Sequence, residues 1–136
     1  MVKQIIKDVF FLSQKAEPAT KNDIQTAQDL LDTLGAHESE CVGMAANMIG
    51  IRKRIIVVNV ETMNIAMLNP VIIKRSGAYE TEEGCLSLSD TRSITRYHDI
   101  EVKYQDMELR KHRQKYSGWT AQIIQHECDH LEGILI

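Results

Sequence analysis

The sequence contains only three cysteines, Cys41, Cys85 and Cys128, which cannot all pair within one chain, and a domain of this size does not need disulfides to fold. In a reducing compartment such thiols are usually buried, catalytic or bound to a metal. A long apolar run is also missing from residues 1–12, where Lys3 and Lys7 interrupt the hydrophobic side chains. This excludes a signal-peptide core or a membrane span in that segment. We therefore expect a cytoplasmic protein with no membrane partner.

Neither sign of charge forms a long block along the chain. The 16 basic and 19 acidic residues give a formal net charge of −3. Direct nucleic-acid binding is therefore not indicated, since it would call for a concentrated basic face. We find no repeat, low-complexity tract or linker, and 43% of the residues are hydrophobic. We expect residues 1–136 to fold as a single domain, and a monomer rather than an oligomer.

The sequence QHECDHL at residues 125–131 contains a HExxH pattern. On a helix, His126 and His130 stand at i and i+4, so both imidazoles project from one face and can bind one metal ion. Glu127 lies roughly 100° further round the helix, from where it can reach a water on that metal. The pattern favours metal-assisted hydrolysis. The alternative is an accidental match in which the two histidines are ordinary surface or core groups.

Helices are expected near both ends of the chain, with strands between them. Thr20 is a candidate N-cap for a packing helix over residues 21–34, and Gly35 is expected to end it. A break is expected at Gly77 and Ala78. Such an order, without βαβ alternation, predicts an α+β fold with mostly antiparallel β-sheets packed around the C-terminal HExxH helix. The expected strands are residues 54–60, 66–73, 100–105 and 109–116.

Two further motifs carry small residues. Residues 43–50, GMAANMIG, leave room for another backbone or a ligand to come close, although tight internal packing would give the same composition. Residues 83–87, EGCLS, place Cys85 next to a glycine, where the backbone can present a thiolate to a metal. A buried hydrophobic role for this cysteine is the alternative.

Taken in order, these three motifs resemble those of peptide deformylase, the metal enzyme that removes the formyl group from the N-terminal methionine of nascent bacterial proteins. The likeness covers nearly the whole chain. It implies that Cys85, His126 and His130 are the metal ligands and that Glu127 is the general base. It also implies one divalent metal ion, Fe²⁺ in the cell, with Zn²⁺, Ni²⁺ or Co²⁺ as substitutes. The implied partners are N-formylmethionyl peptides on nascent chains near the ribosome.

The resemblance also implies two hydrogen-bond donors for the oxyanion that develops during hydrolysis. One is the backbone N–H of Leu86. The other is usually a glutamine side chain, but this chain has Met48 at that position, and a thioether cannot donate. The neighbouring Asn47 carries an amide. We do not expect it to replace the glutamine, because adjacent side chains in an extended segment point apart.

The substrate pocket is predicted from the same helix. Ile123 and Trp119 precede His126 by three and seven residues and so lie on its side of the helix. With Val42 and Gly43 they are expected to line an apolar pocket for the methionine side chain, while the Gly43 edge pairs with an extended peptide. The alternative is that Ile123 and Trp119 are simply core residues.

Asp129 is expected to form an ion pair with Arg92 or Arg96, the alternative being a solvated charge. The leading hypothesis for the whole chain is a peptide deformylase. One rival is a protein of the same fold with attenuated activity or a different small-amide substrate, suggested by Met48. The other is a non-catalytic metal- or peptide-binding protein, against which Glu127 argues, since a structural site needs no base.

Overall fold

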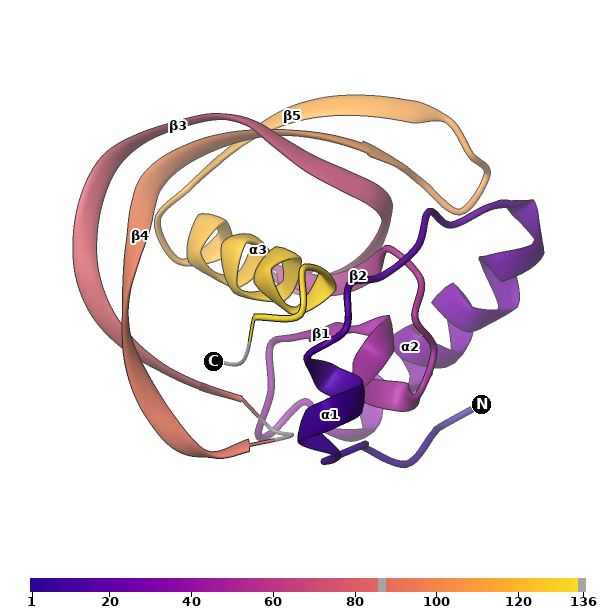
Figure 1. Cartoon of the computed structure of the whole chain (residues 1–136). Helices are drawn as coiled ribbons and strands as arrows, with labels where there is room; N and C mark the ends of the chain where they lie inside the picture. Colours follow the sequence, from indigo (N-terminus) through magenta and orange to yellow (C-terminus); the bar gives the residue numbers. More distant parts are fainter. Residues whose placement is uncertain (86–87, 135–136) are drawn as a thin grey trace.

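A computed structural model of the chain describes residues 1–85 and 88–134, and it contains helices at both ends of a strand-rich middle. Figure 1 shows how these elements are arranged. The α-helices are α1 (Val9–Leu12), α2 (Ile24–Ala36) and α3 (Gly118–Leu131), and the short 3₁₀ helices are η1 (Lys21–Asp23) and η2 (Ala46–Ile49). The strands are β1 (Gly43–Ala45), β2 (Ile55–Val60), β3 (Met63–Cys85), β4 (Leu88–Gln105) and β5 (Lys111–Ser117).

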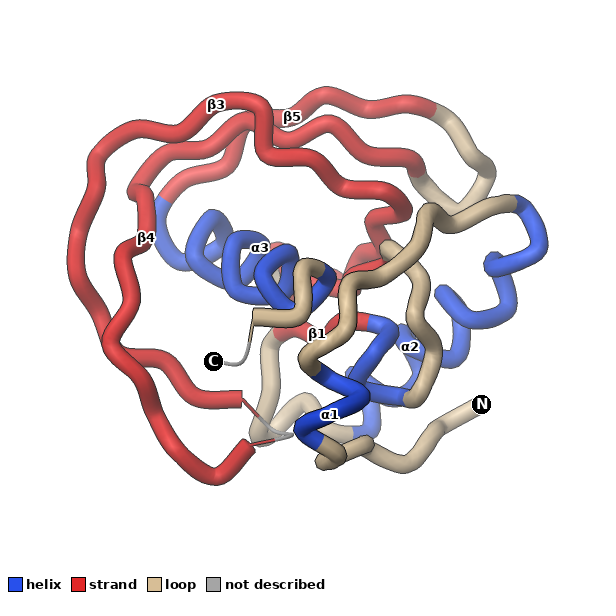
Figure 2. The backbone as a smooth tube through the Cα atoms, in the orientation of Figure 1, coloured by secondary structure: helices blue, strands red, loops and turns tan. Residues whose placement is uncertain are grey.

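The five strands form one antiparallel sheet in the order β1-β2-β3-β4-β5. The long strands β3 and β4 do not lie flat. They curve as an arch around α3, while α1 and α2 lie beyond β1 and β2 (Figures 1 and 2). Three register shifts interrupt the β3–β4 ladder. Such irregularities bend a strand and increase its twist, which allows the sheet to wrap around a helix.

One of these shifts begins beside Asn69, whose φ of 53° lies in the left-handed region. Its side chain accepts a hydrogen bond from the Ala19 N–H at 2.8 Å and donates to the Ala19 carbonyl at 3.0 Å. The next residue, Pro70, has no N–H to give to the ladder. The amide of Asn69 thus anchors the N-terminal segment to the bend that turns β3 towards the arch.

The hydrophobic core lies on both faces of β2, because successive side chains of a strand point to opposite faces. Ile55 and Val57 pack in the cluster on the α2 side, together with Leu30 and Leu34 of that helix. Ile56 and Val58 pack in the second cluster, which the residues Ala121, Ile123, Ile124 and Leu131 of α3 join. The HExxH helix is therefore fixed against the middle of the sheet.

The predicted fold class is confirmed: α+β, with an antiparallel sheet around a C-terminal HExxH helix and an N-terminal packing helix. Several predicted boundaries are wrong, and the strands predicted over residues 66–73 and 100–105 are only parts of the longer β3 and β4. Thr20 caps η1 rather than the α-helix itself, and α2 runs through Gly35 to Ala36. The expected break at Gly77 is a bend within β3, because the ladder is paired on both sides of it. No helix in the described part of the chain is long and apolar enough to cross a membrane.

Candidate metal centre and active site

The helix α3 holds the candidate site in place through one apolar face and one polar anchor. Ala121, Ile124 and Leu131 are fully buried on the face that meets the sheet. On a neighbouring face, the side chain of Gln125 accepts a hydrogen bond from the Tyr97 N–H at 2.9 Å and donates to the Tyr97 carbonyl at 2.8 Å. Gln125 thereby fixes the helix to the inner side of β4, so that the residues after it have a defined orientation.

Three residues of α3 bring potential metal ligands together. One ligand atom from each of His126, Glu127 and His130 lies within 4.8 Å of the others. The two Nε2 atoms of the histidines are 3.1 Å apart. Glu127 Oε1 and His130 Nδ1 are buried and have no hydrogen-bond partner among the described residues. Two converging imidazoles beside an unsatisfied carboxylate oxygen suit a divalent cation that prefers nitrogen ligands.

The imidazole of His126 is oriented by a carboxylate. Its Nδ1 donates to Glu83 Oε1 at 2.7 Å, which leaves the lone pair of Nε2 facing His130. Metal-binding histidines are commonly fixed in this way, with the second ring nitrogen hydrogen-bonded to a carboxylate. The sequence had assigned no role to Glu83. A signal was available in the sequence, because Glu83 precedes the predicted ligand Cys85 by two residues, and i and i+2 share a face in a regular strand.

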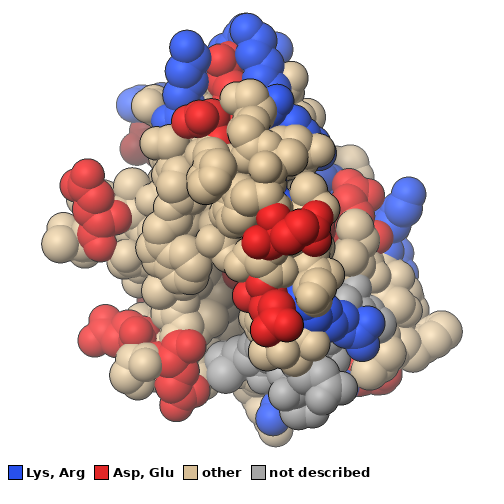
Figure 3. All heavy atoms as spheres, turned by 90° about the vertical axis from the view of Figure 1, so that its left-hand side faces the viewer, with Lys and Arg blue, Asp and Glu red and all other residues tan. Residues whose placement is uncertain are grey.

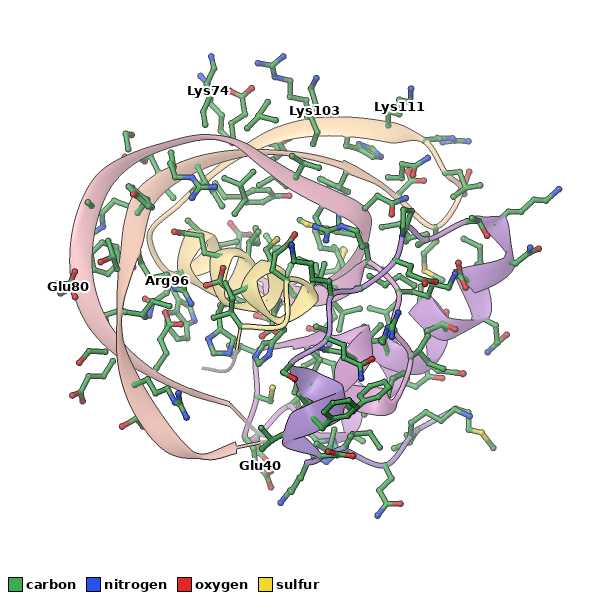
Figure 4. All side chains as sticks on the ribbon, in the orientation of Figure 1. Glu40, Lys74, Glu80, Arg96, Lys103 and Lys111 are labelled. Carbon is green, nitrogen blue, oxygen red and sulfur yellow. The ribbon has the colours of Figure 1, made fainter. Side chains whose placement is uncertain are left out.

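Glu83 is in turn held by Arg96, which Figure 4 shows between β4 and α3. The guanidinium Nε and Nη2 donate to the two carboxylate oxygens at 2.9 and 2.7 Å. Its Nη1 donates to Asp129 at 2.6 Å, so of the two arginines predicted for Asp129 the structure selects Arg96. Gln122 donates to Glu83 at 2.9 Å. The network joins β3, β4 and α3 behind the histidines.

Burial and hydrogen bonding shift the pKa values of three of these groups. Burial alone would raise the pKa of Glu83, but hydrogen bonds from His126, Arg96 and Gln122 outweigh it and lower the pKa to about 2. Burial raises the pKa of Glu127 to about 7. Burial also lowers the pKa of His130 to about 3, which keeps this imidazole neutral and able to bind a cation.

The remaining predicted ligand is the last residue of β3, and the predicted oxyanion donor follows it in the sequence. Cys85 is the last residue of β3 and its backbone pairs with Leu88. Its side chain and the whole of Leu86 lie outside the described residues. Of the two other cysteines, Cys41 donates its thiol hydrogen to the Gly43 carbonyl, and burial raises the pKa of Cys128 to about 12. A thiol so weakly acidic is a poor metal ligand or nucleophile.

A cavity of about 450 Å³ opens beside the histidines. All four predicted pocket residues line it, namely Val42, Gly43, Trp119 and Ile123. Trp119 is 61% exposed, so it is not a core residue, whereas Ile123 is buried. Gly43 has no room for a side chain: a Cβ there would lie 2.7 Å from Ile123 Cγ2 and 3.0 Å from Glu127 Oε2. The glycine lets the β1 backbone approach the carboxylate closely.

Met48 also lines this cavity and is 1% exposed. Its sulfur accepts a hydrogen bond from the Ala45 N–H at 3.4 Å. A thioether has no hydrogen to donate, so Met48 cannot donate a hydrogen bond to a ligand. Asn47 and Met48 lie in η2 rather than in the extended segment that was predicted. The amide of Asn47 is nevertheless committed elsewhere, because it donates to the His130 carbonyl at 2.9 Å. The Asn47 side chain therefore anchors the C-terminal part of α3 to η2.

Comparison with known proteins adds independent information. Residues 3–136 match the family described as polypeptide deformylase. A peptide deformylase from Clostridium beijerinckii is 55% identical over 136 residues, which covers all of both chains. One from Dictyoglomus turgidum is 40% identical over 125 residues, covering 91% of this chain and 80% of the relative.

Solved structures agree. The crystal structure of peptide deformylase from Thermotoga maritima superposes with a TM-score of 0.89 at 31% identity, covering 99% of this chain and 95% of that one. An Acinetobacter baumannii peptide deformylase, solved with Met-Ala-Ser bound, gives a TM-score of 0.88 at 31% identity over 99% of this chain and 97% of that one. The full-length identity and the shared fold show that this chain belongs to the polypeptide deformylase family, the metal-dependent enzymes that remove the N-formyl group from nascent peptides.

Proposed function

We propose that this chain hydrolyses the formyl group of N-terminal formylmethionine with Glu127 as the proton carrier and with Cys85, His126 and His130 as ligands of one divalent cation. The observation that carries this proposal is the position of Glu127. Its carboxylate lies beside two converging imidazoles, and one of its oxygens is buried without a partner among the described residues. A purely structural metal site has no use for such a group.

A cation held by two imidazoles and a thiolate supplies Lewis-acid chemistry at the formyl carbonyl. Ferrous iron is our proposal for the cell, with zinc, nickel or cobalt as substitutes, because a mixed sulfur and nitrogen ligand set suits several of these ions. Glu83 contributes by holding the His126 ring through Nδ1 at 2.7 Å. The neutral state of His130 leaves both of its nitrogens free of positive charge.

Glu127 moves the proton of the reaction. It accepts a proton from the water that attacks the formyl carbon, and it passes this proton to the amine nitrogen when the carbon–nitrogen bond breaks. The products are formate and a peptide with a free N-terminus. In the metal-free site burial raises the Glu127 pKa to about 7, and the charge of a bound cation would lower this value. The backbone N–H of Leu86 remains our proposed donor to the oxyanion.

The cavity supports an extended peptide with an apolar first side chain. Val42, Trp119 and Ile123 offer apolar surface beside the catalytic carboxylate. The peptide would lie along the edge of β1 at Gly43, which forms one side of the sheet. The Acinetobacter baumannii relative binds Met-Ala-Ser, which is the product expected from the formylated form of that tripeptide. We accordingly propose that the substrates of this chain are formylmethionyl nascent chains near the ribosome. We also propose that the protein is cytoplasmic and monomeric, and that residues 1–136 form a single domain.

The test is turnover of formyl-Met-Ala-Ser by protein purified without oxygen and loaded with ferrous iron. Replacing Glu127 by Gln removes the proton carrier and keeps the side-chain shape. We expect kcat to fall by about 100- to 10,000-fold, the usual contribution of general acid–base catalysis. The matched control is Glu80→Gln, an exposed carboxylate of β3, which should retain full activity. A Glu127→Gln variant that keeps its metal and its turnover would refute the proposed role.

A further inference from the structure

Five basic side chains gather on the outer face of the arch, at the end of the molecule remote from the cavity. They are Lys74 of β3, Lys103 of β4, and Lys111, Arg113 and Lys115 of β5, which we call the basic face. Cross-strand pairing places them together: Lys74 is opposite Glu101, Glu101 is opposite Lys115, and Lys103 is opposite Arg113. Directly paired residues of an antiparallel sheet project from the same side. All five side chains are exposed.

Most of this charge is not neutralised locally. Glu101 forms an ion pair with Arg113, but the four lysines of the basic face have no ion pair within the described residues. If Glu101 and Asp99 at the margin are counted with the basic face, the region contains five cations and two carboxylates. Its net charge is then +3. The chain as a whole carries −3, so the rest of it carries −6. Figure 3 shows Lys and Arg most concentrated at the upper end of the molecule, with a few Asp and Glu among them, and Asp and Glu with scattered basic residues lower down.

We propose that the basic face binds structured RNA through its phosphate backbone, without sequence preference. Alternate residues of β5 lie about 7 Å apart and neighbouring strands about 5 Å apart, so Lys111, Arg113 and Lys115 extend over roughly 14 Å. A nucleic-acid duplex carries one charge for about every 1.7 Å of its axis, so such a row faces several phosphates at once. RNA helices are recognised mainly through phosphates and shape.

This inference revises the expectation drawn from the sequence, which rested on the lack of a basic block along the chain. The basic face is assembled from residue 74 and residues 103–115, and only the pairing of β3, β4 and β5 brings them together. A protein with a net negative charge can still bind a polyanion when its positive charge is concentrated on one face.

Neither edge protection nor membrane binding accounts for all of these lysines. Lysines often protect an exposed edge strand from pairing with other chains. That reason applies to β5, which is the edge of the sheet, but not to Lys74 and Lys103 on the inner strands. A membrane-binding face would combine basic residues with several apolar side chains that insert between lipids. Beside the basic face Val71 is an exposed large apolar residue, and one such side chain is too little for insertion.

The orientation is compatible with catalysis. Figure 4 shows Lys74, Lys103 and Lys111 at one end of the molecule and Glu40 at the other. Glu38, Glu40 and Glu82 line the cavity. RNA would be attracted to the basic face and repelled from the acidic rim, so that the cavity stays open to a peptide. The inference does not depend on the proposed hydrolysis, because RNA binding is measured without substrate.

The experiment measures binding of a fluorescently labelled RNA hairpin with a 20-base-pair stem of arbitrary sequence to the metal-loaded protein, by anisotropy at 50 to 200 mM salt. With four lysine contacts, the affinity should fall roughly 100-fold over this range. The test variant replaces Lys103, Lys111 and Lys115 by Gln. The control variant replaces Lys7, Lys15 and Lys21 by Gln, three exposed lysines outside the basic face, and so makes the same change in net charge.

We expect the basic-face variant to bind at least about 10-fold more weakly at 50 mM salt and to lose most of the salt dependence, about one unit of log–log slope for each lysine. The control variant should bind within about twofold of the unmodified protein, and all three proteins should have the same turnover. No binding at 50 mM salt would overturn the inference, as would equal weakening in both variants. Binding to vesicles of anionic lipid but not to the hairpin would overturn it in favour of a membrane surface.

Discussion

Replacing Glu83 by Gln should show how strongly the buried network behind the histidines depends on charge. The substitution keeps the shape of the side chain but removes the negative charge that faces Arg96. Both residues are buried, with exposed fractions of 7% and 3%. The guanidinium would keep its bond to Asp129, which is more exposed, and would lose its buried partner. Breaking a buried ion pair by removing one partner usually costs several kcal/mol.

The pKa of Glu83 gives the magnitude and its pH dependence. It falls from an ordinary value of 4.5 to about 2 in the folded protein. A lowered pKa contributes stability that is fully present above pH 4.5 and is lost as the pH falls towards 2. The shift corresponds to about 3 kcal/mol at neutral pH and to about 1 kcal/mol at pH 3. The glutamine variant lacks this group, so its stability should not show that loss.

The assay is urea unfolding of metal-free protein, with a chelator present, at pH 7 and at pH 3. We expect Glu83→Gln to be about 3 kcal/mol less stable at pH 7 and about 1 kcal/mol less stable at pH 3. Because both proteins contain the same other titrating groups, their difference reports Glu83 together with the groups that it contacts directly. The control Glu80→Gln, at an exposed position of β3, should change stability by no more than about 0.5 kcal/mol. A Glu83→Gln cost that is the same at both pH values would refute the reasoning.

Three further substitutions test the cavity. Met48→Gln should raise kcat at least 10-fold, because it adds a hydrogen-bond donor for the oxyanion, and one such donor typically contributes about 100- to 1,000-fold to turnover. An unchanged kcat would contradict the view that Met48 leaves the oxyanion without this donor. Gly43→Ala should lower kcat at least 10-fold, because its methyl group would lie 3.0 Å from Glu127 Oε2; full turnover would show that the backbone yields easily. Trp119→Ala should raise KM about 10-fold and change the free energy of unfolding by no more than about 1 kcal/mol. A loss of about 3 to 5 kcal/mol in the free energy of unfolding would instead indicate a core tryptophan.

The sequence predicted those features of the fold that depend on local spacing. The HExxH helix can be predicted because its histidines are one turn apart and its apolar residues, Ala121, Ile124, Cys128 and Leu131, repeat at three- and four-residue intervals. The strand over residues 100–105 can be predicted because apolar and polar residues alternate there. The four pocket residues were predicted from helix periodicity and small side chains, and all of them line one cavity. Local patterns of this kind require no knowledge of the rest of the chain.

Features that depend on the course of β3 and β4 were not predictable in the same way. Gly77 was expected to break the chain, but hydrogen bonding continues on both sides of it and its φ of 76° bends the strand. The Glu83 and Arg96 pair depends on how two long strands curve and place their inner faces against α3. Asn47 was expected not to replace the missing oxyanion donor because its segment was taken to be extended, and that reason is wrong. Its segment is a 3₁₀ helix, and its amide is committed to the His130 carbonyl.

The curvature of the arch has a consequence for the chemistry. Glu83 stands near the end of β3 and His126 in the middle of α3, 43 residues later, yet their side chains are 2.7 Å apart. Arg96 of β4 connects Glu83 to Asp129 of α3, so a single guanidinium fixes the strand relative to the helix. Cys85 follows Glu83 by two residues on the same strand. The ion pair that orients His126 therefore also sets the distance between the two elements that carry the proposed ligands, and weakening it should loosen the metal as well as the fold.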